Sequence, residues 1–513
     1  MREKIAIKSS IIGLGSKMIT MILSLVVTKV YVQYLGIELK GIDGIFSNVL
    51  GFLQLTELGI STAIIYALYQ PIVENNIREI QILMHYYKIV YRAICVVILI
   101  VGAALIPFLP FFITESTYSY NYLVFIYYLQ VISSASTYLL AYKRNLLYAD
   151  QKQYITTLVD TSVNVLCSVI RIFIIVATHS YVLNVFWLII QNVSSNLIIG
   201  IWCNKNYPYL KEKVTGKYNK IFELKSNVKN IMIGKISGWV YSSTDYLIMS
   251  RFVGLILVGK LTNYYTLRNT LTTLSSSIVS PMQPILGNYI RENNNKEKTY
   301  GIFRTYTFIR FLLANIITVG FIVMANPVVS VWIGEEYTIQ EITIILLAVD
   351  IFISITHGPT GELIQVLGLF SDDRNMSIVG TIINLVFSFL LVYPLGVNGV
   401  LLGTVMAQCY YWYKRTSIIF REYFESGLKK YIFAVIKYII CIVVEIGILK
   451  GLFSCKFIGK SGWIPVLLEC SLCVCICFIF IFIWFGKTFE WTFALNMIKR
   501  NFIMRKKQEG NNI

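Results

Sequence analysis

Long apolar segments recur from one end of the chain to the other, separated by short polar segments. Most are about 20 residues or longer, the length that an α-helix needs to cross the hydrocarbon core of a bilayer. The pattern predicts fourteen membrane-spanning helices. Their approximate bounds are 9–32, 42–68, 93–112, 119–141, 155–178, 181–202, 230–250, 261–287, 305–325, 339–367, 375–393, 396–413, 431–449 and 463–485.

The composition agrees with lipid as the solvent. Of the 513 residues 56% are hydrophobic and only 14% are charged, and the mean hydropathy is +0.66. A soluble protein would carry about a quarter of charged residues. The first apolar segment is too long for a cleaved signal peptide, and small residues are rare where it ends, so we interpret it as a permanent helix. We therefore expect an all-α polytopic membrane protein.

The distribution of basic residues predicts the orientation in the membrane. With the N-terminus in the cytoplasm, the inner segments hold 32 Lys and Arg and the outer segments hold 6. Cytoplasmic loops are generally enriched in Lys and Arg, so both termini are expected to be cytoplasmic. The same asymmetry explains much of the net charge of +18, and nucleic-acid binding is not needed to account for it.

An internal repeat connects the first and seventh predicted spans. The segments YLGIELKGIDGIFSN (34–48) and FVGLILVGKLTNYYT (252–266) both contain aromatic-x-Gly-x-x-x-x-Gly. Their glycines align at a constant offset of 218 residues, as Gly36/Gly41 and Gly254/Gly259. Two glycines at equal spacing are a weak signal alone. Their common position, where a span leads into the next segment, strengthens it.

The repeat predicts two six-helix lobes in the same orientation, related by an axis along the membrane normal. Transporters built in this way bind substrates between their halves. The expected organisation is an N-lobe at 1–202, a basic cytoplasmic linker at 203–229, a C-lobe at 230–413, and two additional helices with a basic tail at 414–513.

Three lysines lie inside predicted spans of this repeat. Lys17 and Lys235 are again 218 residues apart, and both lie about five to eight residues into their helices from the cytoplasmic side. A lysine at that depth usually faces a bundle interior or an aqueous cavity, so the pair is a candidate site for an anion, with a structural ion pair as the alternative. Lys29 is a further candidate, although it could extend to the outer interface.

The chemistry of an enzyme is not evident. Cys470, Cys473, Cys475 and Cys477 lie in the last span without a histidine, and zinc sites need converging thiolates. We interpret these cysteines as packing or lipid-facing residues. The sequence contains no recognisable triad, phosphate loop or metal motif, so we expect neither catalysis nor a cofactor.

Several segments resemble the bacterial polysaccharide transporter family, the lipid-linked oligosaccharide flippases of the multidrug/oligosaccharidyl-lipid/polysaccharide exporter superfamily. They are TKVYVQYLGIELKGIDGIFSN (28–48), TELGISTAII (56–65) and STDYLIMSRFVG (243–254), together with the basic linker and the plan of twelve helices plus two. The resemblance covers about residues 5–420. Lys260 departs from the small or apolar residue expected at its position.

The resemblance implies an undecaprenyl-pyrophosphate-linked repeat unit as substrate, moved from the inner to the outer leaflet of the bacterial cytoplasmic membrane by alternating access. The product would serve surface polysaccharide such as O-antigen or capsule. The expected partners are a polysaccharide polymerase and glycosyltransferases, with H⁺ or Na⁺ as the coupling cation and no nucleic acid.

Other charged residues inside spans complete the candidate sites. Arg171 and Arg268 join Lys17, Lys235 and Lys29 as candidates for substrate binding, because phosphate groups need cations. Four acids are candidates for ion coupling. They are Glu57, Asp245, Asp350 and Glu362. The last two flank HGPTG (357–361), where Pro359 is expected to interrupt the helix.

Three other functions are compatible with parts of the pattern. A multidrug exporter of the same fold would expel organic cations and would favour acidic, aromatic cavities, which the lysines argue against. A membrane-embedded glycan polymerase would need a sizeable outer loop, and the outer loops are short. A scaffold without transport would pair its intramembrane charges within the bundle.

Overall fold

The computed structural model describes residues 2–54, 60–113, 116–212, 239–240, 243–279, 296–367, 369–454 and 462–492. Within these ranges the regular structure is entirely helical, with no strand. The chain divides into two compact units, Met1–Thr262 and Asn263–Ile513, which we call the first and second units.

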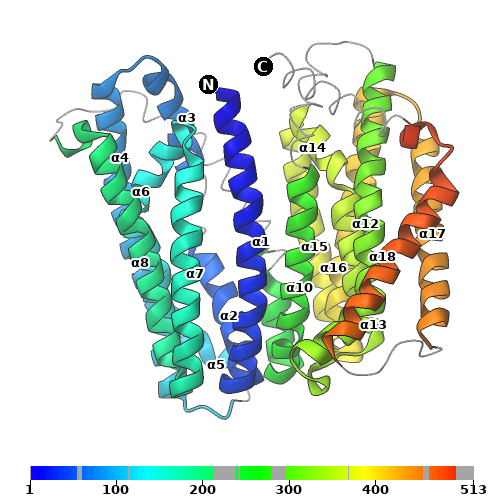
Figure 1. Cartoon of the computed structure of the whole chain (residues 1–513), viewed down its shortest axis with the longest axis horizontal. Coiled ribbons are helices and arrows are strands. Elements are labelled where there is room, and N and C mark those ends of the chain that lie inside the picture. Colours follow the sequence, from blue (N-terminus) through cyan, green and yellow to red (C-terminus); the bar gives the residue numbers. More distant parts are fainter. Residues whose placement is uncertain are drawn as a thin grey trace. The chain divides into compact units, whose positions relative to one another are not determined.

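The first unit consists mainly of long helices. In Figure 1, α6, α7 and α8 run along one another, and α6 and α7 both pack against α8. The helices are α1 (Arg2–Leu35), α2 (Ile37–Gln54), α3 (Ile60–Val73), α4 (Ile77–Ala104), η2 (Ile106–Phe108), α5 (Leu109–Phe112), α6 (Tyr120–Ala149), α7 (Gln153–Thr178), α8 (Tyr181–Asn206) and η3 (Pro208–Lys211), followed by the start of α10 (Leu255–Val279).

The second unit is built around α12, which contacts α13, α17 and α18. In the apolar stretch of α12, 61% of the residues are buried, whereas only 22% are buried in the apolar stretch of α18. Helix α12 is therefore central to the unit and α18 is peripheral. The helices are α12 (Lys296–Trp332), η4 (Glu335–Tyr337), α13 (Glu341–Thr356), α14 (Gly358–Val366), α15 (Phe370–Leu395), α16 (Val397–Ile419), the π-helical η5 (Phe420–Phe424), α17 (Leu428–Ser454) and α18 (Trp463–Phe485).

The predicted membrane fold is confirmed. Ten helices in the described ranges are long and apolar enough to cross a bilayer, and they match ten of the predicted spans. Of the other four, the span at 396–413 corresponds to α16, and those at 42–68, 230–250 and 261–287 include residues outside the described ranges. The total of fourteen spans therefore stays a prediction.

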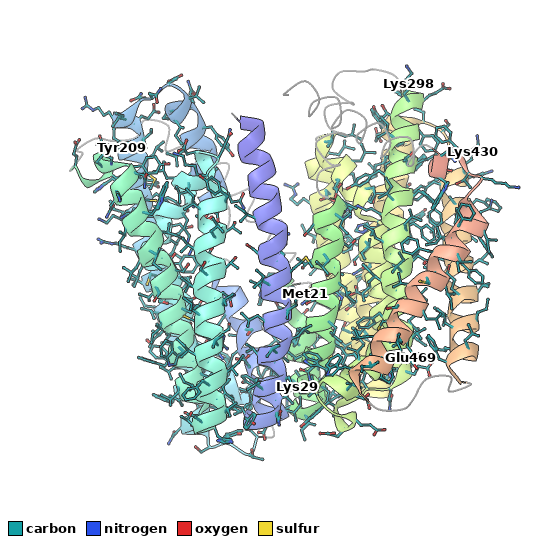
Figure 2. The ribbon with its side chains drawn as sticks, viewed as in Figure 1. Met21, Lys29, Tyr209, Lys298, Lys430 and Glu469 are labelled. Atoms are coloured by element: carbon teal, nitrogen blue, oxygen red, sulfur yellow. The ribbon has the colours of Figure 1, made fainter. Side chains whose placement is uncertain are left out.

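Exposed apolar side chains cover the outside of these helices. Phe173 on α7 is 72% exposed and Ile464 on α18 is 75% exposed, as expected of surfaces in contact with lipid tails. Figure 2 shows Lys298 and Lys430 at one end of the second unit and Glu469 near the other. Lys298 and Lys430 belong to segments predicted to be cytoplasmic, and the orientation in the membrane stays a prediction.

The repeated glycines meet in the first unit. Gly36 ends α1 with φ +89°, and Gly254 precedes α10 with φ +102°, a backbone conformation that glycine adopts without steric cost. A Cβ on Gly41 would lie 2.5 Å from the carbonyl oxygen of Leu255, and a Cβ on Gly259 would lie 2.4 Å from that of Ile37. The two glycines therefore allow α2 and α10 to cross backbone against backbone, in a contact that is symmetric between the repeats.

The repeat continues through later helices of both units. Helices α4, α6, α7 and α8 begin at residues 77, 120, 153 and 181, and α12, α13, α15 and α16 begin at 296, 341, 370 and 397. The interval between corresponding starts stays between 216 and 221 residues, close to the offset of 218 found in the glycine motif.

The boundary between the compact units follows Thr262, later in the chain than the linker predicted at 203–229. The glycine crossing gives the reason, because it attaches the start of α10 to α2. The predicted boundaries at 202, 230 and 413 were based on span counts alone, and as a division into lobes they stay a prediction.

The helix break predicted at Pro359 is confirmed. Helix α13 ends at Thr356 and α14 begins at Gly358, so the proline lies in the first turn of α14, where an N–H group would have no hydrogen-bond partner within the helix.

Candidate functional site: a polar cavity in the first unit

A cavity of about 370 Å³ lies among four helices of the first unit. Its lining is polar for a membrane protein, with four carboxamides, two aliphatic hydroxyl groups, two tyrosines and an ion pair. The residues come from α4 (Tyr91), α6 (Thr137, Tyr138, Ala141, Arg144), α7 (Asp160, Val163, Asn164) and α8 (Gln191, Asn192, Ser195, Asn196).

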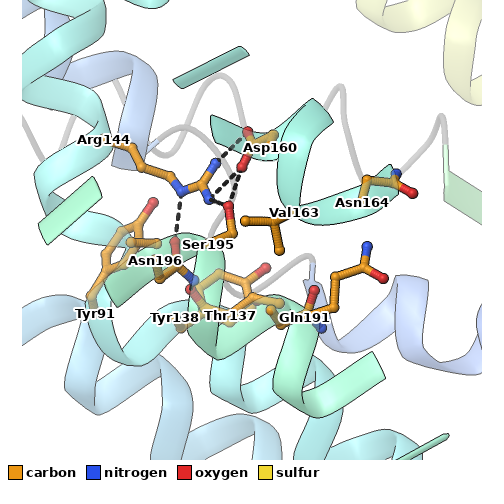
Figure 3. Close-up of a pocket in the computed structure, with 12 residues that line it drawn as sticks. Tyr91, Thr137, Tyr138, Arg144, Asp160, Val163, Asn164, Gln191, Ser195 and Asn196 are labelled. Atoms are coloured by element: carbon orange, nitrogen blue, oxygen red, sulfur yellow. Dashed lines mark hydrogen bonds and ion pairs between the residues drawn. The ribbon is translucent and has the colours of Figure 1, made fainter. Parts of the chain in front are cut away.

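Arg144 and Asp160 form a bidentate ion pair at one end of this cavity (Figure 3). The Nη1 and Nη2 groups donate to Oδ2 and Oδ1 over 2.7 and 2.8 Å. Nη2 also donates to Ser195 Oγ over 2.9 Å, and Nε donates to Asn196 Oδ1 over 2.6 Å. Ser195 Oγ in turn donates to Asp160 Oδ1. Paired hydrogen bonds between arginine and a carboxylate are strong and directional, so this end of the cavity is held in one geometry.

Small and polar side chains bring α6 and α8 together beside the ion pair. Asn196 donates to the carbonyl of Thr137 over 3.1 Å, and Asn192 donates to Ser133 Oγ over 3.2 Å. Hydrogen bonds of this kind across helices are common inside membrane bundles, where small residues allow close approach. They place the polar face of α8 toward the cavity.

The other end of the cavity carries Asn164 and Gln191. Figure 3 shows both carboxamides on the side away from the Arg144–Asp160 pair, with Val163 between the two ends. Gln191 Oε1 is buried without a hydrogen-bond partner among the described residues. Asn164 Oδ1 accepts from Ser168 Oγ over 3.0 Å.

The residues of this cavity were missing from the sequence-based candidates. Asp160 was recognisable as an acid inside a span, but its partner Arg144 precedes that span by a helix turn and a loop. The hydrogen-bond network around the Arg144–Asp160 pair is recognisable only from the packing of α8, because α8 supplies Ser195 and Asn196 as further partners of Arg144.

The predicted lysine pair is only partly within the described residues. The side chain of Lys17 is exposed on α1, whereas Lys235 and Glu57 lie outside the described ranges. Lys29 is half-buried near the end of α1 that leads into α2 (Figure 2). A site shared by Lys17 and Lys235 stays a prediction.

Arg171 belongs to a second polar cluster in the first unit. Its Nε donates to Asn184 Oδ1 over 2.9 Å, and Asp43 lies close enough to interact with it electrostatically. Asp43 Oδ1 accepts from Gln130 over 2.7 Å and from the Tyr181 hydroxyl over 3.0 Å. Asp43 was not a candidate although it lies in the repeated motif, because only the glycines of that motif align.

In the second unit, two predicted sites of opposite role contact each other. Arg268, predicted to bind substrate, forms an ion pair with Asp350, predicted to couple ions. Gln408 also donates to the Asp350 carboxylate. Each charge is thus compensated inside the second unit.

Glu362 is bound in the same way. It pairs with Arg310, and the Tyr306 hydroxyl donates to its Oε2 over 2.6 Å. A Cβ on Gly358 would lie 2.0 Å from Arg310 Nη1, so the glycine beside the helix break makes room for the guanidinium group. Asp245 is buried, 6% exposed, in the segment of the first unit that precedes α10.

Known structures share this fold. A structure of the lipid II flippase MurJ, in an inward closed conformation, matches 94% of this chain and 99% of its own with a TM-score of 0.70 and 15% identity. An inward-facing multidrug resistance MATE family transporter of the MOP superfamily matches 82% of this chain and 99% of its own, with a TM-score of 0.67 and 15% identity.

Sequence comparison adds a relative and a family. A Haloferax volcanii protein named as the probable low-salt glycan biosynthesis flippase Agl15 is 21% identical over 179 residues. That match spans 35% of this chain and 38% of the relative, well under two thirds of the relative's length. The family model described as polysaccharide biosynthesis protein matches residues 6–290, more than half of the chain. The chain therefore belongs to the polysaccharide biosynthesis protein family.

Proposed function

We propose that this protein moves undecaprenyl-pyrophosphate-linked oligosaccharide units from the inner to the outer leaflet of a bacterial cytoplasmic membrane by alternating access. The observation that carries the proposal is the polar cavity of the first unit, enclosed by helices whose outer surfaces are apolar. An oligosaccharide loses many hydrogen bonds in hydrocarbon, so its passage needs polar groups that replace water. The lipid tail can stay in the bilayer throughout.

The family supports a role in polysaccharide biosynthesis, and the named relative supports transport. The family concerns polysaccharide biosynthesis, and the Haloferax volcanii relative is named as a probable flippase. The substrate class, the surface polysaccharide that results, such as O-antigen or capsule, and any polymerase or glycosyltransferase partner belong to the proposal.

Export of organic cations is the second candidate, because the fold is shared with multidrug transporters. A pump for cations needs a carboxylate whose charge is available to the substrate. Asp160, Asp350 and Glu362 each form an ion pair with an arginine. Their pairing favours the glycan substrate.

Flipping by the purified protein tests the proposal. The full chain is reconstituted in vesicles with fluorescent undecaprenyl-pyrophosphate-linked oligosaccharide, and the labelled glycan that reaches the opposite leaflet is measured with a membrane-impermeant lectin. We expect transfer well above that of protein-free vesicles, and reduced transfer for Arg144→Gln. Transfer equal to protein-free vesicles, combined with efflux of an organic cation such as ethidium, would establish the second candidate instead.

The proposed orientation has its own test. Because basic residues are predicted to concentrate on one side, we expect both termini in the cytoplasm. Reporter fusions after Tyr337 should indicate the outside and fusions after Tyr218 the inside. An outside signal at Tyr218 would contradict the division into two six-helix lobes.

A further inference from the structure

The cavity of the first unit has little positive charge to offer a phosphate group. Four of the five N–H groups of Arg144 are used, two by Asp160, one by Ser195 and one by Asn196. The carboxylate of Asp160 cancels the formal charge of the guanidinium. A pyrophosphate bound here would have to displace Asp160 from Arg144 and then lie beside that carboxylate.

The opposite end of the cavity has uncharged hydrogen-bonding groups with spare capacity. Gln191 Oε1 is buried without a partner among the described residues. Asn164 lines the cavity and accepts a hydrogen bond through its oxygen from Ser168, so its two amide N–H groups are available to a ligand. A carboxamide presents a donor and an acceptor side by side, which matches a sugar hydroxyl or an acetamido group.

Aromatic and apolar groups border the same space. Tyr91 and Tyr138 line the cavity with their ring centroids 5.7 Å apart, and Val163 lies between its two polar ends. An amphipathic tyrosine can contact the C–H face of a sugar while its hydroxyl keeps a polar partner. The volume of about 370 Å³ is at the small end of the range for ligand sites. This size suits contact with one unit of a glycan at a time.

From these observations we propose that the cavity recognises an uncharged sugar residue of the glycan through Asn164 and Gln191, while the pyrophosphate binds elsewhere. The inference rests on the proposed function and adds the part of the substrate that this site takes. It makes the two carboxamides determinants of which glycan is exported.

Direct binding tests the site without transport. The full chain in lipid nanodiscs is titrated with glucose, N-acetylglucosamine and inorganic pyrophosphate, and binding is followed by saturation-transfer NMR. We expect at least one of the two sugars to bind. Gln191→Met should weaken that sugar at least tenfold and leave pyrophosphate unchanged. Since Gln191 Oε1 has no partner to lose, the variant should keep its fold.

A matched control separates the cavity from the rest of α8. Asn206 is an exposed carboxamide on the same helix, outside the cavity, with its amide bonded to the carbonyl of Trp202. Asn206→Leu should bind sugar like the unmodified chain. Absence of sugar binding to the unmodified chain, equal binding by Gln191→Met, or pyrophosphate binding that falls with Gln191→Met would overturn the proposal.

Transport distinguishes failure of this inference from failure of the proposed function. Lipid-linked oligosaccharides with and without an acetamido sugar are compared in the flipping assay, using Asn164→Leu and Gln191→Met. A changed ratio between the two glycans supports recognition in the cavity. If both glycans flip at unchanged rates in both variants, the inference fails and the flippase stands. If nothing flips but sugar binding depends on Gln191, the sugar site stands and the proposed function fails.

Discussion

Replacing Gly41 with alanine should destabilise the first unit at the crossing of α2 and α10. The new Cβ would lie 2.5 Å from the Leu255 carbonyl oxygen and 3.2 Å from the Gly259 nitrogen. Both are backbone atoms, so neither can rotate away, and the helices must separate. Overpacking of this kind lowers the free energy of unfolding by about 1–3 kcal/mol. The higher helix propensity of alanine offsets about 0.5–1 kcal/mol of this loss. We expect a net loss of about 1–2 kcal/mol.

The reciprocal change, Gly259→Ala, meets the Ile37 carbonyl oxygen at 2.4 Å and should cost a similar amount. The double variant should cost less than the sum of the two. One separation of the helices relieves both contacts, and mutations that share a contact are not additive. Thermal unfolding in detergent micelles, followed by circular dichroism, measures each variant.

Gly320→Ala is the control for this series. Gly320 lies inside α12, where a Cβ would meet nothing within 4 Å, so the variant should be as stable as the unmodified chain or gain up to about 1 kcal/mol. Unfolding midpoints of Gly41→Ala equal to those of Gly320→Ala, or strictly additive losses in the double variant, would refute the close crossing.

The ion pairs and the charge of the substrate can each be tested. Asp160→Asn and Arg144→Gln should each destabilise the first unit by about 1–3 kcal/mol. The loss should be smaller than for a fully buried pair because the Asp160 side chain is 42% exposed. In a double-mutant cycle measured by thermal unfolding, the double variant should recover part of the lost stability. Gly358→Ala should displace Arg310 from Glu362 and lower the melting temperature, whereas Gly320→Ala should not. Flipping should be faster when the loading side of the vesicle is negative, because the membrane potential then contributes up to about 2.3 kcal/mol of driving force per uncompensated charge per 100 mV. Equal rates with and without a potential would exclude electrogenic transport.

The sequence was informative wherever one local rule decides the structure. Apolar length predicted the spans, Pro359 predicted the break between α13 and α14, and the equal spacing of Gly41 and Gly259 indicated a repeat. The meeting of these two glycines was not predictable, because a spacing along the chain does not say which helices touch.

Partners of charged residues were the part that sequence could not supply. Arg268 and Asp350 were assigned separate roles, yet they neutralise each other across 82 positions of the chain. Such a pair depends on how α10 and α13 pack, and neither residue carries a local signal for it. The assignment of Lys17 by repeat register has the same weakness.

The distribution of paired charges bears on where the pyrophosphate binds. Arg144, Arg268 and Arg310 each have a carboxylate partner inside their own unit, so an anion would have to compete for them. Lysines can also bind phosphate groups, as flexible point charges. Lys17 and Lys29 lie on α1, and α1 packs along α7, the helix that carries Asn164. Within the first unit, the helix with the predicted phosphate ligands thus lies beside a helix that lines the polar cavity. If the proposed sugar site is correct, a pyrophosphate joined directly to that sugar would bind on an element next to α7, and α1 with Lys17 and Lys29 is such an element.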